Sequence, residues 1–144
     1  MTELIPTRDT FVLFPLGAKR FALPAELVSE LAHQDEAQSF PHTSPLLTGV
    51  VLRRNQIIPV ADVASVLIGP EAPVRKFYLV LKREVNGKVS RTAIPVTGEC
   101  ELAEAEQLPG TGKLPPHVSG LLSLKDEIVE VLDIERLLSA EVRV

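Results

Sequence analysis

The chain has 144 residues, a formal net charge of −4 and 45% hydrophobic residues, which is enough to bury a core without a metal or a disulfide. It has no Trp, one Tyr and no basic stripe, so a nucleic-acid partner is not expected. Cys100 is the only cysteine, which excludes an intrachain disulfide and suits a reducing compartment. The sequence shows no signal peptide and no run near the roughly 18 apolar residues that span a bilayer. We therefore expect a cytoplasmic protein without direct membrane insertion.

The first half of the chain predicts two hairpins followed by a helical turn. Gly17-Ala18-Lys19 separates two apolar runs, and Arg54-Asn55 separates two more, as is typical of hairpin turns. Asp62 comes next and is expected to cap a short helix, because its carboxylate can accept hydrogen bonds from unpaired backbone N–H groups. We expect a strand at 11–16, a return strand that ends near Leu23, and two further strands at 50–53 and 57–60. A proline-bearing loop is expected at 40–45 and a helical turn at 63–67.

The second half repeats this order of elements. Asn86-Gly87 is the strongest hairpin signal in the chain, because both residue types tolerate positive φ. Asp133 is expected to cap the second helical turn. We expect a strand at 77–82, a return strand that ends near Val96, and two further strands at 121–124 and 128–132. A proline-bearing loop is expected at 108–116 and a helical turn at 134–138.

An internal repeat relates the two halves. Residues 49–67 align without a gap to residues 120–138, and the same spacing holds upstream, except in the first hairpin. We place the two copies at 11–67 and 77–138, within one domain at 10–140 that follows a tail at 1–9. Strands could be exchanged between the copies. The aligned pairs include Ala22 with Ala93, Pro24 with Pro95, Glu30 with Glu101, Gly49 with Gly120, Ile57 with Ile128, and Asp62 with Asp133.

Each copy therefore contains four or five strands and one or two helical turns. That content fits a small SH3-like or Greek-key barrel, which closes the sheet and removes its exposed edges. The sequence predicts an all-β fold of two small SH3-like barrels packed together, with short helical turns.

No residue pattern predicts catalysis, a metal site or a cofactor. The three histidines are scattered, with no pair at metal-ligand spacing. Cys100 lies between two glutamates that would raise the pKa of its thiol, so we interpret it as a small buried hydrophobe. Residues 109–113 lack the spacing of a phosphate-binding loop. The sequence therefore favours a binding protein over an enzyme.

Acidic and basic residues recur at matching places in the two copies. The interval from Glu30 to Arg54 equals the interval from Glu101 to Lys125. Exposed turns commonly carry charges, and an ion pair there contributes little to stability. The alternative is that these charges belong to a contact surface.

Several segments together resemble the CheW-like domain family. Residues 49–62 read GVVLRRNQIIPVAD and are similar to that family's G-V-I-N-L-R-G-x-I-V-P-V-V-D segment. Residues 28–31 resemble its V-x-E-I segment, and Phe40-Pro41 resembles its I-P. Residues 118–138 resemble its closing G-hairpin-L-D-I-x-x-L-L. The order and spacing of these segments, from about Thr10 to Ser139, carry the resemblance.

The resemblance implies two packed β-barrels without catalysis. Such domains couple methyl-accepting chemoreceptors to the histidine kinase CheA, and they bind a receptor hairpin tip and the kinase's own CheW-like domain. The resemblance associates Glu30 and Arg54 with function and puts Val28 at the receptor-binding surface. We expect Glu30 and Arg54 to lie close together, and Val28 to border a groove between the barrels.

The chain departs from the family at the tip of its second hairpin. Leu52-Arg53 replaces Asn-Leu, and Asn55 replaces Gly, although Asn can still adopt a left-handed turn conformation. Arg53 puts a charge where an apolar residue is usual, so it joins Asn55 among the candidate contact residues. A diverged, non-flagellar kinase pathway, for example one controlling pili, is an alternative function. A small-barrel nucleic-acid binder is a more distant alternative.

Overall fold

Twelve strands and two α-helices make up the part of the chain that the structure, a computed structural model, describes: residues 9–33, 37–39, 47–53, 55–68, 77–108 and 114–142. The first half contains β1 (Asp9–Leu16), β2 (Lys19–Pro24), the 3-10 turn η1 (Ala25–Leu27), β3 (Val28–His33), β4 (Ala37–Ser39), β5 (Leu47–Arg53), β6 (Gln56–Ala61) and α1 (Val63–Leu67). The second half contains β7 (Phe77–Val85), β8 (Lys88–Val96), β9 (Glu101–Ala105), β10 (Gln107–Leu108), β11 (Val118–Leu124), β12 (Glu127–Leu132) and α2 (Ile134–Val142).

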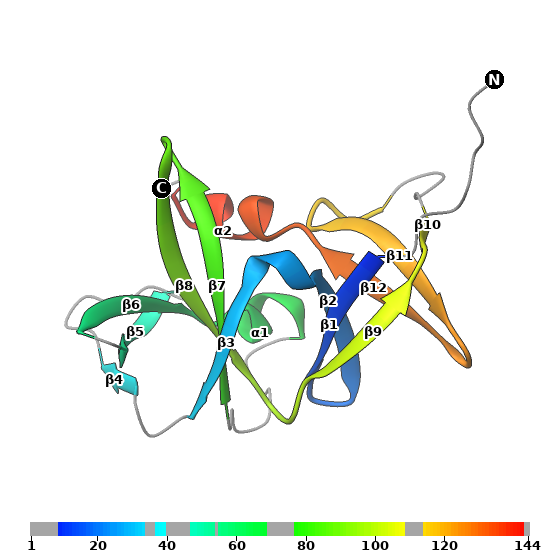
Figure 1. Cartoon of the computed structure of the whole chain (residues 1–144), viewed down its shortest axis with the longest axis horizontal. Helices are drawn as coiled ribbons and strands as arrows, with labels where there is room; N and C mark the ends of the chain where they lie inside the picture. Colours follow the sequence, from blue (N-terminus) through cyan, green and yellow to red (C-terminus); the bar gives the residue numbers. More distant parts are fainter. Residues whose placement is uncertain are drawn as a thin grey trace.

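The strands form two curled six-stranded sheets, side by side in Figure 1. Barrel A, on the right, has the strand order β10-β11-β12-β2-β1-β9, and barrel B, on the left, has the order β3-β7-β8-β6-β5-β4. Barrel B is built from one continuous part of the chain, β3 to β8. Barrel A combines β1 and β2 with β9 to β12, so barrel B is inserted into barrel A. The predicted all-β fold of two SH3-like subdomains is confirmed.

Each barrel takes strands from both sequence copies. In barrel A, β12 pairs in parallel with β2, and Val131 lies opposite Ala22. In barrel B, β6 pairs in parallel with β8, and Val60 lies opposite Ala93. Val60 aligns with Val131 in the repeat, and Ala22 aligns with Ala93, so the two parallel pairs are equivalent. The strand exchange that the sequence left open is therefore present.

Gly49 and Gly120 occupy equivalent positions, as predicted. Gly49 lies opposite Val60, and Gly120 lies opposite Val131. An irregularity precedes each glycine in its strand, between Leu47 and Gly49 and between Val118 and Gly120. The limits assigned to the two copies, 11–67 and 77–138, stay a prediction.

The hairpin turns depend on residues that tolerate a left-handed backbone. Asn86 and Gly87 have φ values of 52° and 77°, as a two-residue turn of the primed type requires. Asn55 has φ 63°, so the replacement of glycine by asparagine preserves this turn as expected. Gly17 adopts φ 69° in the turn between β1 and β2.

Most of the residues in the interiors of the two barrels occupy corresponding positions. Phe11 and Leu13 of barrel A match Tyr78 and Val80 of barrel B in the registers of their hairpins. The core of barrel A consists of Phe11, Leu13, Ala22, Ala105, Leu122, Val129 and Val131. The core of barrel B consists of Ala32, Val51, Ile58, Val60, Tyr78, Val80 and Ala93.

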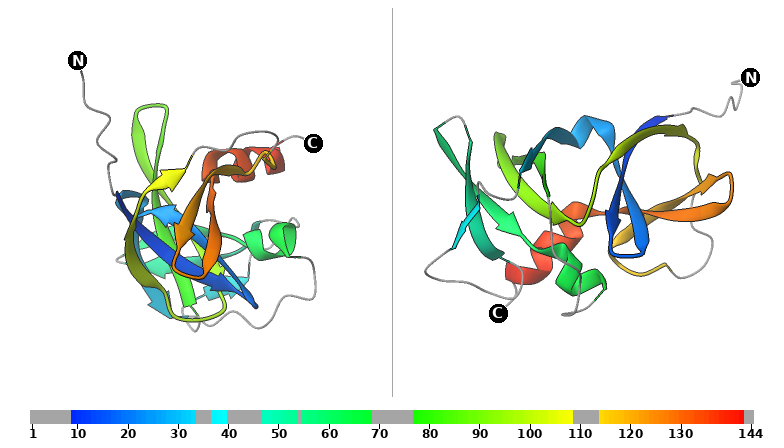
Figure 2. Two further views of the ribbon diagram at one scale, coloured as in Figure 1. Left: turned by 90° about the vertical axis from the view of Figure 1, so that its right-hand side faces the viewer. Right: turned by 90° about the horizontal axis from the view of Figure 1, so that it is seen from below.

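The largest apolar cluster lies between the barrels and joins them into one unit. Phe14 and Leu16 of β1 and Leu79 and Leu81 of β7 are buried there, together with side chains of both helices. Figure 2 shows α1 and α2 beside this junction. The helices contribute Val63, Ala64, Ile134, Leu137 and Leu138 to the cluster. Because α1 and α2 complete this cluster, the two barrels share a core.

Three details differ from the prediction. Each half has six strands where the sequence suggested four or five, because short strands such as β4 and β10 carry little periodic signal. Asp133 does cap α2, accepting a 3.2 Å hydrogen bond from the backbone N–H of Arg136, but Asp62 makes no side-chain cap bond to α1. Helix α2 also continues beyond Leu138 to Val142. The predicted loop at 40–45 lies outside the described residues.

Candidate protein-interaction site

Val28 lies at the junction of the two barrels. It follows the turn η1 and begins β3, where it lies opposite Leu81 of β7. The register of β3 shifts between Val28 and Glu30. Val28 is half-buried and packs against the central cluster, so part of its surface is available to a partner.

A pocket of ≈ 250 Å³ opens between the barrels beside Val28. Leu27 and Leu81, the neighbours of Val28 along the chain and across the sheet, both line it. The full lining comprises Pro24, Leu27, Leu81, Lys82, Arg83, Ser119, Leu132, Asp133, Ile134 and Glu135. Since these residues come from β2, η1, β7, β11, β12 and α2, the pocket exists only where the two barrels meet.

One ion pair closes the rim of this pocket. The guanidinium of Arg83 donates to the carboxylate of Glu135 through two hydrogen bonds, Nη2 to Oε1 at 2.8 Å and Nε to Oε2 at 3.0 Å. The hydrogen bond from Arg83 lowers the pKa of Glu135, and the same contact raises the pKa of Arg83. The bidentate geometry holds β7 against the start of α2.

Three of the other predicted contact residues, Glu30, Arg53 and Asn55, lie on or next to barrel B. Glu30 is half-buried on β3, opposite Val80. Asn55 is exposed in the turn between β5 and β6. Arg54 lies outside the described residues, so its predicted proximity to Glu30 stays a prediction. Arg53 ends β5, opposite Gln56.

The hairpin that carries Asn55 has an apolar outer face. Leu52 and Ile57 lie opposite each other and are 54% and 72% exposed. The next pair outward from the turn on the same face is Val50 with Pro59, both half-buried. Exposed apolar side chains grouped on a rigid hairpin are typical of protein-interaction surfaces.

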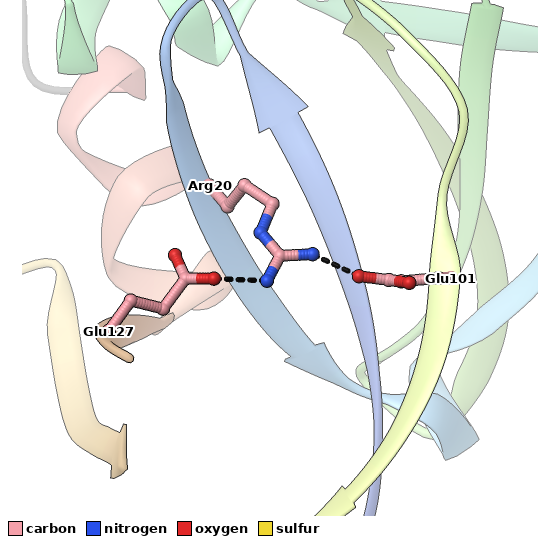
Figure 3. Close-up of polar contacts among 3 residues, drawn as sticks. All are labelled: Arg20, Glu101 and Glu127. Atoms are coloured by element: carbon pink, nitrogen blue, oxygen red, sulfur yellow. Dashed lines mark hydrogen bonds and ion pairs between the residues drawn. The ribbon is translucent and has the colours of Figure 1, made fainter. Parts of the chain in front are cut away.

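A charged cluster on barrel A was missed by the sequence reasoning. Arg20 of β2 bonds both Glu101 of β9 and Glu127 of β12, as Figure 3 shows. The hydrogen bond to Glu127 is the main cause that raises the pKa of Arg20. Glu101, the counterpart of Glu30, therefore pairs with Arg20.

The repeat contained the signal for this cluster. Arg91 takes the place in the second copy that Arg20 has in the first, and Glu127 likewise corresponds to Gln56. In barrel B, Arg91 donates from Nη1 to Oε1 of Gln56 at 2.9 Å. In both barrels, an arginine therefore bonds a side chain on a strand of the other copy. The acceptor is the carboxylate of Glu127 for Arg20 and the amide of Gln56 for Arg91.

Two features that the sequence raised, a metal site and the reactivity of Cys100, can be checked among the described residues. These residues contain no cluster of three or more His, Cys, Asp or Glu side chains that could hold a metal ion. Cys100 is half-buried, and burial raises the pKa of its thiol to about 11, so it is protonated at neutral pH. Burial, rather than the neighbouring glutamates, is the cause. None of the helices in this part of the chain is long and apolar enough to cross a membrane.

These features define an all-β protein of two SH3-like subdomains with exchanged strands and a shared core. The CheW-like domain model matches residues 10–142, and the chain belongs to this family. A similar solved structure is the scaffolding protein TtCheW from Thermoanaerobacter tengcongensis, with a TM-score of 0.71 and 18% sequence identity over 95% of this chain and 92% of that one. No curated protein sequence matches the chain.

Proposed function

We propose that this chain is a non-enzymatic cytoplasmic adaptor that couples chemoreceptors to a CheA-type histidine kinase in a bacterial chemosensory array. The family match over residues 10–142 carries the proposal. The likeness to a CheW scaffolding protein supports the fold on which it depends.

The receptor contributes a helical hairpin tip, and the pocket between the barrels is the surface that suits it best. Val28, Leu27 and Leu81 give this junction an apolar side next to a charged rim at Arg83 and Glu135. An amphipathic helix can bury its apolar face on such a surface while its polar face stays in water. Val28 is the residue that we expect to contact the receptor.

The kinase contacts the far end of barrel B in this proposal. Arg53 ends β5, Asn55 lies in the turn before β6, and Glu30 lies on β3 of the same barrel. The exposed pair of Leu52 and Ile57 supplies the apolar area that a stable interface needs. The charges then fix the orientation of the partner rather than most of the affinity.

A diverged kinase pathway, for example one that controls pili, is a second candidate. Leu52 takes the place of the family's Asn and is exposed, which makes the outer face of the hairpin more apolar. A kinase with a more apolar complementary surface would suit this change better than one adapted to an amide.

Reconstitution tests the proposal. The purified chain, the CheA-type kinases of the source organism and a receptor cytoplasmic fragment are mixed singly and together, and complexes are measured by pull-down and size-exclusion chromatography. We expect a ternary complex in which kinase autophosphorylation depends on both the receptor and the chain. A chain that binds neither protein would contradict the proposal. Binding to only a kinase of a pilus-type pathway would favour the second candidate.

A further inference from the structure

The hairpin between β7 and β8 extends beyond its counterpart between β1 and β2. The pairs Val80–Ala93 and Leu13–Ala22 are equivalent. From there the β7–β8 ladder continues to the pair of Val85 with Lys88, whereas the β1–β2 ladder ends sooner, with Leu16 opposite Lys19. In Figure 1 this longer hairpin rises from barrel B at the upper left.

Four positions in barrel A have equivalents in barrel B, and the side chains at these positions differ in charge between the two barrels. In barrel A, Arg20 lies opposite Pro15 and bonds two glutamates, which gives a formal charge of −1. In barrel B, Arg91 lies opposite Lys82 and bonds the neutral Gln56. Glu30 takes the place of Glu101, so the formal charge of the four barrel B residues is +1. The barrel A set is Pro15, Arg20, Glu101 and Glu127, and the barrel B set is Lys82, Arg91, Glu30 and Gln56.

The pair of Lys82 with Arg91 is unfavourable for the fold by itself. Residues directly opposite in an antiparallel pair have Cα atoms about 5 Å apart, and like charges there repel. Lys82 is exposed and forms no ion pair with a described residue. In barrel A the same place has a proline, so the fold does not require a cation there. Two cations are therefore held together at a point where an anionic partner would relieve their repulsion.

The surroundings of this pair favour a protein partner. Val89, which is 66% exposed, and Glu84 lie opposite each other further along the same face of the hairpin. The opposite face is anchored to α2 through Arg83 and Glu135, so the hairpin is held in place. A surface that binds phosphates or anionic lipid relies on several cations without an intervening acid. An exposed valine and a glutamate next to two cations suit a mixed acidic and apolar segment instead.

We propose that the β7–β8 hairpin binds an acidic, partly apolar segment of a partner protein through Lys82, Arg91 and Val89. The segment places carboxylates between the two cations and an apolar side chain on Val89. The neutral Gln56 bonds Arg91 at the place where the carboxylate of Glu127 bonds Arg20 in barrel A. This inference does not depend on the identity of the receptor or the kinase.

A peptide titration tests this surface on the intact chain. The probe is a short capped peptide in which Glu alternates with Leu, and the comparison peptide has Lys in place of Glu. NMR spectra of the isotope-labelled protein report both the affinity and the residues that are perturbed. We expect shifts confined to residues 82–91 and their neighbours, with the Glu peptide only. Raising NaCl from about 50 to about 500 mM should weaken binding, because the contact is between exposed charges.

Three variants separate this surface from the rest of the molecule. K82E/R91E should weaken binding of the Glu peptide at least tenfold. Q56E keeps both cations but reproduces the barrel A arrangement, and it should weaken binding about threefold without lowering the thermal midpoint. K125E changes an exposed lysine of barrel A and should leave binding unchanged.

Other outcomes would overturn the proposal. Equal shifts with the Lys peptide, or unchanged affinity in K82E/R91E, would show that these cations do not select an acidic segment. Stronger binding to vesicles of phosphatidylcholine and phosphatidylglycerol than to the peptide would assign the hairpin to a membrane surface. Self-association in sedimentation experiments that K82E abolishes would assign it to a second copy of this chain. If Q56E or K82E/R91E alters the whole spectrum, K82Q provides a milder test with the same expected direction.

Discussion

The two barrels share their interior and differ on their surface. Buried pairs at the centre of barrel A have counterparts in barrel B, such as Val131 with Ala22 and Val60 with Ala93. The clusters around Arg20 and Arg91 occupy equivalent places but have opposite formal charges. Packing constrains the inside of a barrel to a few apolar shapes, whereas an exposed charge changes stability little. The surfaces of the two barrels are therefore less constrained than their cores, which stay alike.

Truncation of the two cores should give the largest effect. Leu122 of barrel A and Val51 of barrel B are equivalent and fully buried. Leu122→Ala should lower the free energy of unfolding by about 2–5 kcal/mol, and Val51→Ala by about 1–3 kcal/mol, because fewer buried atoms are lost. Urea denaturation followed by both circular dichroism and NMR measures these values.

Both core variants should unfold in a single transition, because each barrel takes strands from both halves of the chain and the central cluster joins the two barrels. Two separate transitions would break the comparison, since they would show that each barrel is stable by itself.

Val28 is a position at which the two copies differ in polarity. Its counterpart in the second copy is Glu99, which is exposed. Val28→Glu should weaken receptor-fragment binding about 10- to 100-fold, equivalent to about 1–3 kcal/mol, because the carboxylate would be desolvated against an apolar helix. Calorimetric titration measures the change, and Glu99→Val is the matched control with unchanged affinity. Equal losses in both variants would exclude a role specific to the first copy.

Arg54 and Lys125 allow the same comparison for charge. Arg54→Glu should weaken kinase coupling roughly tenfold by placing an acid at the interface. The thermal midpoint should barely move, because an exposed pair contributes about 0–1 kcal/mol. Lys125→Glu should leave coupling unchanged. A large loss of stability with intact coupling would instead make Arg54 a structural residue.

The ion pair of Arg83 with Glu135 has no counterpart in the first copy, where Leu16 takes the place of Arg83 and is buried. Glu135→Gln should lower stability by less than about 1 kcal/mol at neutral pH, since the carboxylate is largely exposed. Because Arg83 lowers the pKa of Glu135 in the folded state, the contribution is present above the unfolded pKa of about 4.3 and is lost as pH falls through the folded value. Denaturation of the wild-type chain and of the Glu135→Gln variant at pH 7 and about pH 3 measures their free energies of unfolding. The difference between the two free energies should disappear in acid.

Much of the fold followed from the sequence, because its signals are local or periodic. Asn86-Gly87 and Asn55 mark turns through their own backbone preferences, and the recurrence of Gly49 at Gly120 reflects one ladder position used twice. The strand exchange could not be predicted from the sequence. The residues of β2 do not show whether its neighbour is β12, of the other copy, or β6, of the same copy. The pairing of Glu101 with Arg20 was missed for the same reason: the two residues are distant in sequence and meet only through that exchange.

The insertion of barrel B into barrel A also has a consequence for synthesis on the ribosome. All strands of barrel B lie between Val28 and Val96, so this barrel can close soon after its last strand has emerged. β1 and β2 are made first, but their partner β12 is made almost last. Such distant contacts make closure slow, because a long loop must be ordered before they form. We expect β1 and β2 to leave apolar side chains exposed on the nascent chain for longest, and so to be the segment on which chaperones act.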